Sequence, residues 1–131
     1  MAITLRVFGL VCVVVSALHI IFGLQADQML GAGLTEITLT NASLDSQNRF
    51  YGAQFMLMGG VVWLSAKDLA RHASLLRLAM AVFFIGGVAR VISIFVIGWP
   101  SAMIQALLLI ELVLPPAILL WHRAVLSRSN S

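Results

Sequence analysis

The chain alternates between four long apolar stretches and three connections, of which the first is long and the other two are short. The apolar stretches run over Val7 to Gln25, Phe50 to Ser65, Leu78 to Ile97 and Ala102 to Trp121. A bilayer core about 30 Å thick takes roughly 20 residues of helix, and a helix satisfies its own backbone in lipid. The pattern therefore predicts an all-α protein, a four-helix transmembrane bundle with antiparallel up-down topology. We expect one membrane domain over residues 1–131, with helices at about 5–25, 47–66, 75–98 and 101–124 and an external loop at 26–46.

Composition supports a membrane protein and excludes several other classes. The 131 residues are 61% hydrophobic and only 10% charged, whereas a soluble domain carries about 25% charged residues. A chain this short has too little interior to hide that much apolar surface. Its basic residues form no stripe with interleaved aromatic residues, so no nucleic-acid partner is expected. The single cysteine, Cys12, lies in an apolar stretch and is expected to be a buried structural thiol.

Charge in the connections predicts the orientation. Six of the eight basic residues lie at the N-terminus, in the second connection or at the C-terminus: Arg6, Lys67, Arg71, Arg77, Arg123 and Arg128. The first connection instead carries Asp27, Glu36 and Asp45. Because positive residues stay on the cytoplasmic side, both termini are expected there, in a multi-pass protein of the bacterial inner membrane. Signal-peptide cleavage is not expected, since Leu24-Gln25-Ala26 lacks a small residue three positions before the cut.

Arg90 and Glu111 lie near the middles of the third and fourth apolar stretches. A charge at that depth costs several kcal/mol (about 3 on insertion scales) unless a partner relieves it. Arg90 precedes Gly98 by eight residues, about 12 Å, and Glu111 follows Ala102 by nine, about 14 Å. Both residues therefore reach nearly the same level on antiparallel helices. The sequence predicts a buried Arg90–Glu111 pair.

Further polar residues fall at a similar depth in the outer half of the membrane. By the same rise per residue, His19 and Gln54 lie about 9 Å and 8 Å deep, with Arg49 at the rim. Two interpretations remain open: a structural ion pair that sets helix register, or a pocket that opens outward. The candidate ligand-binding or polar-core residues are His19, Arg49, Gln54, Arg90, Ser93 and Glu111.

No metal or cofactor is expected. The chain has one mid-span histidine and no paired ligand spacing such as HxxxH or CxxC. Catalytic residues are not identified, because no Ser-His-Asp set or glycine-rich phosphate loop is present. Glycines at 52, 59, 60, 86 and 87 predict close helix contacts.

Several short motifs resemble a bacterial family of small four-helix membrane proteins that is catalogued as a domain of unknown function. The motifs are Arg49-Phe50-Tyr51-Gly52, Gly87-Val88-Ala89-Arg90-Val91-Ile92-Ser93, Gly98-Trp99-Pro100-Ser101 and Glu111-Leu112. Ala89 stands where the family usually has glycine, which alters packing and removes no chemistry. The resemblance extends from the first helix to Trp121. It implies that Arg49, Arg90, Ser93, Pro100 and Glu111 are the positions to test, and it implies no activity.

The leading functional hypothesis is a non-catalytic membrane protein whose Arg-Glu site binds a small amphipathic or lipid-like ligand, or supports a membrane complex. Its partners would be the bilayer, that ligand, and a second copy or another subunit. The alternatives are a membrane enzyme, in which Glu111 and His19 move protons on a hydrophobic substrate, and a small transporter subunit.

Overall fold

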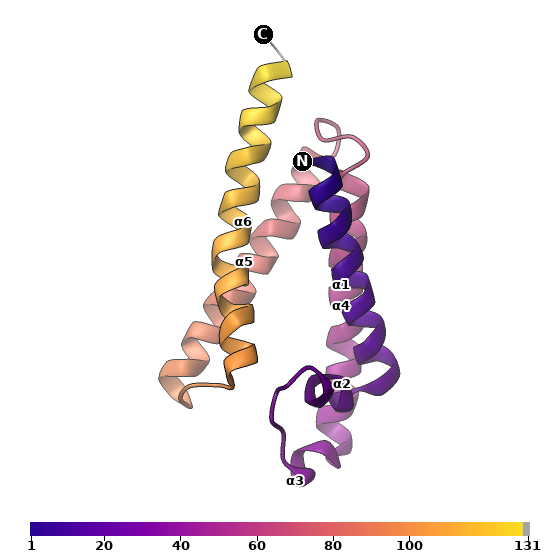
Figure 1. Ribbon diagram of the computed structural model, residues 1–131, viewed down its shortest axis with the longest axis vertical. Helices are drawn as coiled ribbons and strands as arrows, with labels where there is room; N and C mark the ends of the chain where they lie inside the picture. The colour runs from indigo at the N-terminus through magenta and orange to yellow at the C-terminus, as the bar shows by residue number, and fades with distance from the viewer. Residues whose placement is uncertain (130–131) are drawn as a thin grey trace.

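The computed structural model describes residues 1–129, and every regular element among them is a helix. The helices are α1 (Ala2–Phe22), α2 (Leu24–Met29), α3 (Glu36–Leu39), α4 (Ala42–Ser65), α5 (Ala73–Val96) and α6 (Ala102–Ser129). The long helices α1, α4, α5 and α6 run alternately down and up, so both termini lie at one end (Figure 1). The all-α prediction is confirmed.

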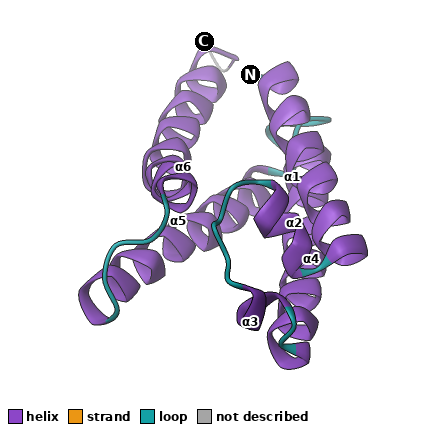
Figure 2. Ribbon diagram, turned by 60° about the horizontal axis from the view of Figure 1, so that its bottom comes forward, coloured by secondary structure: helices purple, strands orange, loops and turns teal. Residues whose placement is uncertain are grey.

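The predicted loop at 26–46 is largely helical. Gly23 has φ +58°, which ends α1 three residues before the predicted position and lets α2 start at once. Asn41 accepts hydrogen bonds from the backbone N–H groups of Ser43 and Leu44, both at 3.1 Å. This N-cap starts α4 at Ala42 instead of 47. The linker with α2 and α3 lies at the end of the molecule away from the termini (Figures 1 and 2).

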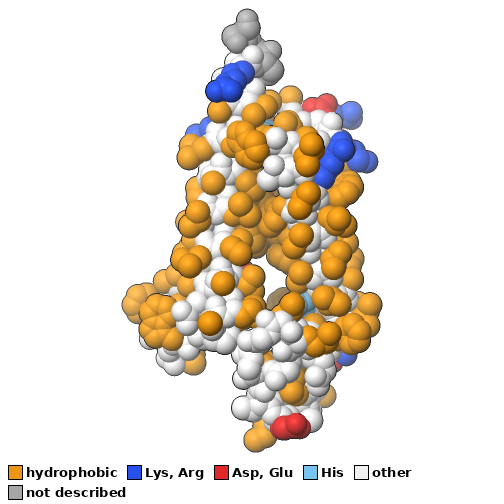
Figure 3. Space-filling view, viewed as in Figure 1, with side chains coloured by type: hydrophobic (Ala, Val, Ile, Leu, Met, Phe, Trp, Pro, Cys, Tyr) orange, Lys and Arg blue, Asp and Glu red, His pale blue; other side chains and the backbone are white. Residues whose placement is uncertain are grey.

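Three described helices, α1, α5 and α6, are long and apolar enough to cross a membrane. Helix α4 has 24 residues, but its first third is polar and only Phe50 to Ser65 is apolar. Apolar side chains cover most of the surface, while lysines and arginines gather at the end that carries the termini (Figure 3). This distribution supports a membrane protein, and α4, whose apolar stretch is the shortest of the four, is not among the three candidate spans.

Glycines bring α1 and α4 into close contact. A Cβ at Gly59 would lie 2.8 Å from both the Gly9 carbonyl oxygen and the Cys12 Cβ, and one at Gly52 would lie 2.9 Å from the His19 Cβ. Gly87 plays the same part between α5 and α6. The predicted contacts at 60 and 86 are wrong, because both glycines face open space.

The apolar core lies at the end of the molecule near the termini. It is formed by Leu5, Cys12, Met58, Val62, Ala66, Leu76, Ala79, Met80, Phe83 and Ile118, which come from all four long helices. There His122 of α6, buried and only 3% exposed, hydrogen-bonds through Nε2 to the Leu69 carbonyl oxygen at 2.8 Å. Toward the other end, the α1/α4 and α5/α6 pairs diverge, and the space-filling view shows a gap between them (Figures 1 and 3).

Candidate functional site

Arg90 of α5 and Glu111 of α6 form an ion pair that joins these two helices. The Arg90 Nε donates to Glu111 Oε2 at 2.7 Å. Gly87, one turn before Arg90, permits this approach, because a Cβ there would lie 3.1 Å from the Glu111 Cβ and 2.8 Å from a Leu112 methyl carbon. Glu111 is 8% exposed, whereas the Arg90 side chain is 37% exposed. The predicted pair is confirmed, with the arginine as its accessible member.

His19 of α1 forms a second polar cluster with Asp27 of α2 and Asn48 of α4. The ring Nδ1 lies 2.7 Å from the Val15 carbonyl oxygen, and Nε2 lies 3.1 Å from Asp27 Oδ1. The Asn48 amide donates to the other Asp27 oxygen, Oδ2. The hydrogen bond from His19, aided by Asn48, holds the pKa of Asp27 below its usual value.

A polar junction places Asp27 beside His19. Arg49 donates from one terminal nitrogen to the carbonyl oxygens of Ile20 and Ile21, at 2.7 and 2.8 Å, and from Nε to Asp45 Oδ2 at 2.7 Å. Asp45 Oδ1 accepts the Leu24 N–H at 3.0 Å, at the start of α2. These bonds satisfy the last carbonyl groups of α1 and the first N–H of α2. Gly23 is required between them, because its Cβ would overlap the Asp45 carboxylate.

The two clusters belong to different helix pairs and are linked by charge. The positive charge of Arg90 contributes to the lowered pKa of Asp27, although His19 is the larger cause. Arg90 is therefore within electrostatic reach of Asp27, while its hydrogen bond goes to Glu111. The structure thus brings three predicted residues, His19, Arg90 and Glu111, to the same end of the molecule.

A family model matches most of the chain. The model for a domain of unknown function, DUF4345, covers residues 1–122. The chain belongs to the DUF4345 family. The comparison with curated proteins found no match, and neither did the comparison with solved structures. The predicted resemblance to a domain of unknown function is confirmed by this match.

Two of the predicted site residues lie apart from both clusters of this DUF4345 protein. Gln54 is exposed, and so is Ser93, although Ser93 lies one turn after Arg90. Neither side chain makes a hydrogen bond to another described residue. Arg49 hydrogen-bonds to Asp45 and to the end of α1, as described above. Its role in this structure is to hold the α1–α2 junction.

Sequence reasoning missed Asp27 and Asn48 as members of the cluster. Asp27 lies eight residues after His19. On a straight helix this spacing separates the two residues by about 12 Å along the axis. The turn at Gly23 brings Asp27 back to His19. The sequence signal for this turn was a glycine followed by a short polar segment. Within residues 1–129, no three His, Cys, Asp or Glu side chains form a metal-binding group.

The lowered pKa of Asp27 predicts acid sensitivity. A carboxyl group whose pKa is lower in the folded than in the unfolded protein stabilises the fold at every pH above its unfolded pKa of about 3.9. This stabilisation is lost as the pH falls through the folded pKa. We expect Asp27→Asn to melt below the wild type at pH 7, with a smaller difference at pH 3. Melting temperatures of the detergent-solubilised proteins between pH 7 and 3 measure this. A constant difference across that range would contradict the expected ionisation.

Proposed function

We propose that this protein is a multi-pass protein of the bacterial inner membrane, and that it binds the polar head of a small amphipathic molecule between its helix pairs. The proposed arrangement is four membrane helices with both termini in the cytoplasm and the gap opening outward. The observation that carries the proposal is that the Arg90 side chain is 37% exposed beside a buried Glu111, with its charge reaching Asp27 of the other helix pair. An ion pair that only fixes the register of two helices does not require an accessible guanidinium near a second polar cluster.

The hydrogen-bonding capacity of the two clusters supports a ligand. Arg90 has five N–H donors, and only its Nε is hydrogen-bonded to a described residue. On the α1/α4 side, the Asn48 Oδ1 is buried and lacks a partner among the described residues. Unpaired groups of this kind are costly unless water or a ligand completes them. Arg90 would therefore bind an acceptor oxygen of the ligand, and Asn48 a donor.

Charge at this end favours a ligand head without net charge. The basic side chains His19, Arg49 and Arg90 are paired with the acidic side chains Asp27, Asp45 and Glu111. Arg90 already has Glu111 as its countercharge, so an anionic head would compete with that carboxylate. The gap lies between apolar helices, and an apolar tail would fit beside the polar groups. A lipid-like or amphipathic molecule with hydroxyl or carbonyl groups meets both conditions.

The hydrogen bonds of His19 favour binding over catalysis. The enzyme hypothesis requires a ring nitrogen that takes a proton from substrate. Both nitrogens of His19 are already hydrogen-bonded, to Val15 and Asp27. Glu111 is likewise held by Arg90. Proton transfer would require breaking one of these bonds, whereas binding requires no rearrangement.

Native mass spectrometry of the protein in mild detergent tests the proposal. We expect the wild type to retain a small molecule, and the double variant Arg90→Leu/Glu111→Leu to fold without it. Replacing both members of a buried pair is close to neutral for stability, so folding is expected to survive. Arg71→Leu, an exposed change far from the gap, serves as the control and should retain the molecule. A folded double variant that still carries the same bound mass would contradict the proposal.

A further inference from the structure

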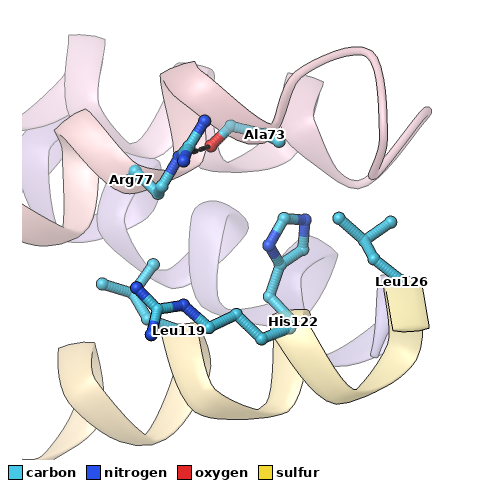
Figure 4. A pocket seen from close by; sticks show the side chains of 6 residues that line it. Ala73, Arg77, Leu119, His122 and Leu126 are labelled. Carbon is cyan, nitrogen blue, oxygen red and sulfur yellow. Dashed lines mark hydrogen bonds between the residues drawn. The ribbon is translucent and has the colours of Figure 1, made fainter.

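A second site is indicated at the end of the molecule that carries the termini. A pocket of about 140 Å³ lies between the start of α5 and the C-terminal part of α6 (Figure 4). Its lining residues are Ala73, Arg77, Leu119, His122, Arg123 and Leu126. His122 and Leu126 project from α6 toward α5 (Figure 4). The lining combines basic and apolar side chains and contains no acid.

We propose that this pocket binds the phosphate group of an anionic phospholipid, with Arg77 and Arg123 as the contacting residues. The three ion pairs described above, His19–Asp27, Arg49–Asp45 and Arg90–Glu111, include neither arginine. Arg77 donates from Nε to the Ala73 carbonyl oxygen at 3.2 Å, which positions its guanidinium on the pocket wall. Its terminal N–H groups stay available for an anion. Guanidinium groups bind phosphate oxygens through paired hydrogen bonds.

The start of α5 adds to the positive potential of the pocket. This helix has no side-chain hydrogen bond at its N-cap and no acidic residue in its first turn. The N-terminal N–H groups of a long helix carry a partial positive charge that favours anions. Ala73, the first residue of α5, belongs to the pocket lining. The helix start therefore acts together with the two arginines, one from each helix.

The apolar part of the pocket favours a lipid over a free phosphate ion. Leu119 and Leu126 lie in the lining, and the neighbouring Leu78 and Leu120 are 63% and 65% exposed on the outer faces of α5 and α6. Trp121 is 44% exposed at this level, where interfacial aromatic residues lie in membrane proteins. A phosphate held by the arginines would leave its acyl chains against these leucines. Basic pockets between helix ends commonly hold anionic headgroups in this way.

Lipid binding by the full-length protein tests the proposal. Detergent-solubilised protein is titrated with phosphatidylglycerol or phosphatidylcholine and analysed by native mass spectrometry. We expect phosphatidylglycerol to be preferred, and Arg77→Gln/Arg123→Gln to weaken its binding roughly tenfold or more. The matched control, Arg6→Gln/Arg71→Gln, removes the same charge from exposed positions at the same end and should change binding much less. Melting temperatures should show that both variants fold.

Three results would overturn the proposal. Equal losses in the two double variants would show attraction to surface charge and no site. Equal binding of both lipids by the wild type would remove the need for an anionic group. Displacement of phosphatidylglycerol by millimolar inorganic phosphate would assign the pocket to a free phosphate ion.

Discussion

Arg90→Leu should destabilise the protein more than Glu111→Leu, and the double variant should recover most of the loss. The first change leaves a carboxylate that is 8% exposed without its partner, a situation that costs about 3–5 kcal/mol in buried pairs. The second leaves an arginine whose side chain is 37% exposed and whose long stem reaches more polar surroundings at lower cost. Thermal melting of the three variants in one detergent gives the comparison.

The double variant separates coupling from two independent effects. Coupled residues give a double variant that is more stable than the less stable single variant, because no charge is left unpaired. Two losses that simply add would mean that the 2.7 Å contact contributes nothing to stability. This outcome would also weaken the proposed site, since the position of Arg90 depends on Glu111.

Gly59→Leu should prevent α1 and α4 from packing, whereas Gly60→Leu should be tolerated. A Cβ at Gly59 meets the Gly9 carbonyl oxygen and the Cys12 Cβ, each at 2.8 Å, and neither is the movable end of a long side chain. Overpacking of this kind costs about 1–3 kcal/mol or more, and the larger leucine places it at the upper end. At Gly60 an added Cβ would point into open space.

The adjacent glycines make this pair of variants well matched. Both changes replace glycine by leucine in the middle of α4, so both gain about 0.5–1 kcal/mol in helix propensity. Any difference in folded yield or melting temperature then reports the contact with α1. Similar losses in the two variants would show that α4 has a different partner or a different rotation about its axis.

Part of the candidate site could be predicted from the sequence because its geometry depends on local distances. Arg90 and Glu111 lie on neighbouring antiparallel helices joined by a short connection. A constant rise of 1.5 Å per residue then places both at one depth, and the cost of an unpaired charge brings them together. His19 could be placed at a depth by the same argument, but its partner could not.

Asp27 shows where that reasoning stops. A helix continued to residue 25, as the hydropathy pattern predicts, would carry the chain away from His19. The chain instead turns into α2 through the positive φ of Gly23, the hydrogen bond that Arg49 donates to the Ile20 carbonyl oxygen and the one that Asp45 accepts from the Leu24 N–H. These bonds join residues more than 20 positions apart, so no periodicity in the first helix reveals them.

The sequence by itself determined that the chain is helical, that its apolar segments suit a membrane, and that Arg90 and Glu111 pair. Hydropathy, segment length and helical rise set these features within one helix or between two neighbours. The tertiary structure decided which glycine of the 59–60 pair contacts α1, how the two helix pairs diverge, and that Arg77 and Arg123 line one pocket. Each of these depends on the tilt of a helix or on its rotation about its own axis, which only contacts with the other helices establish.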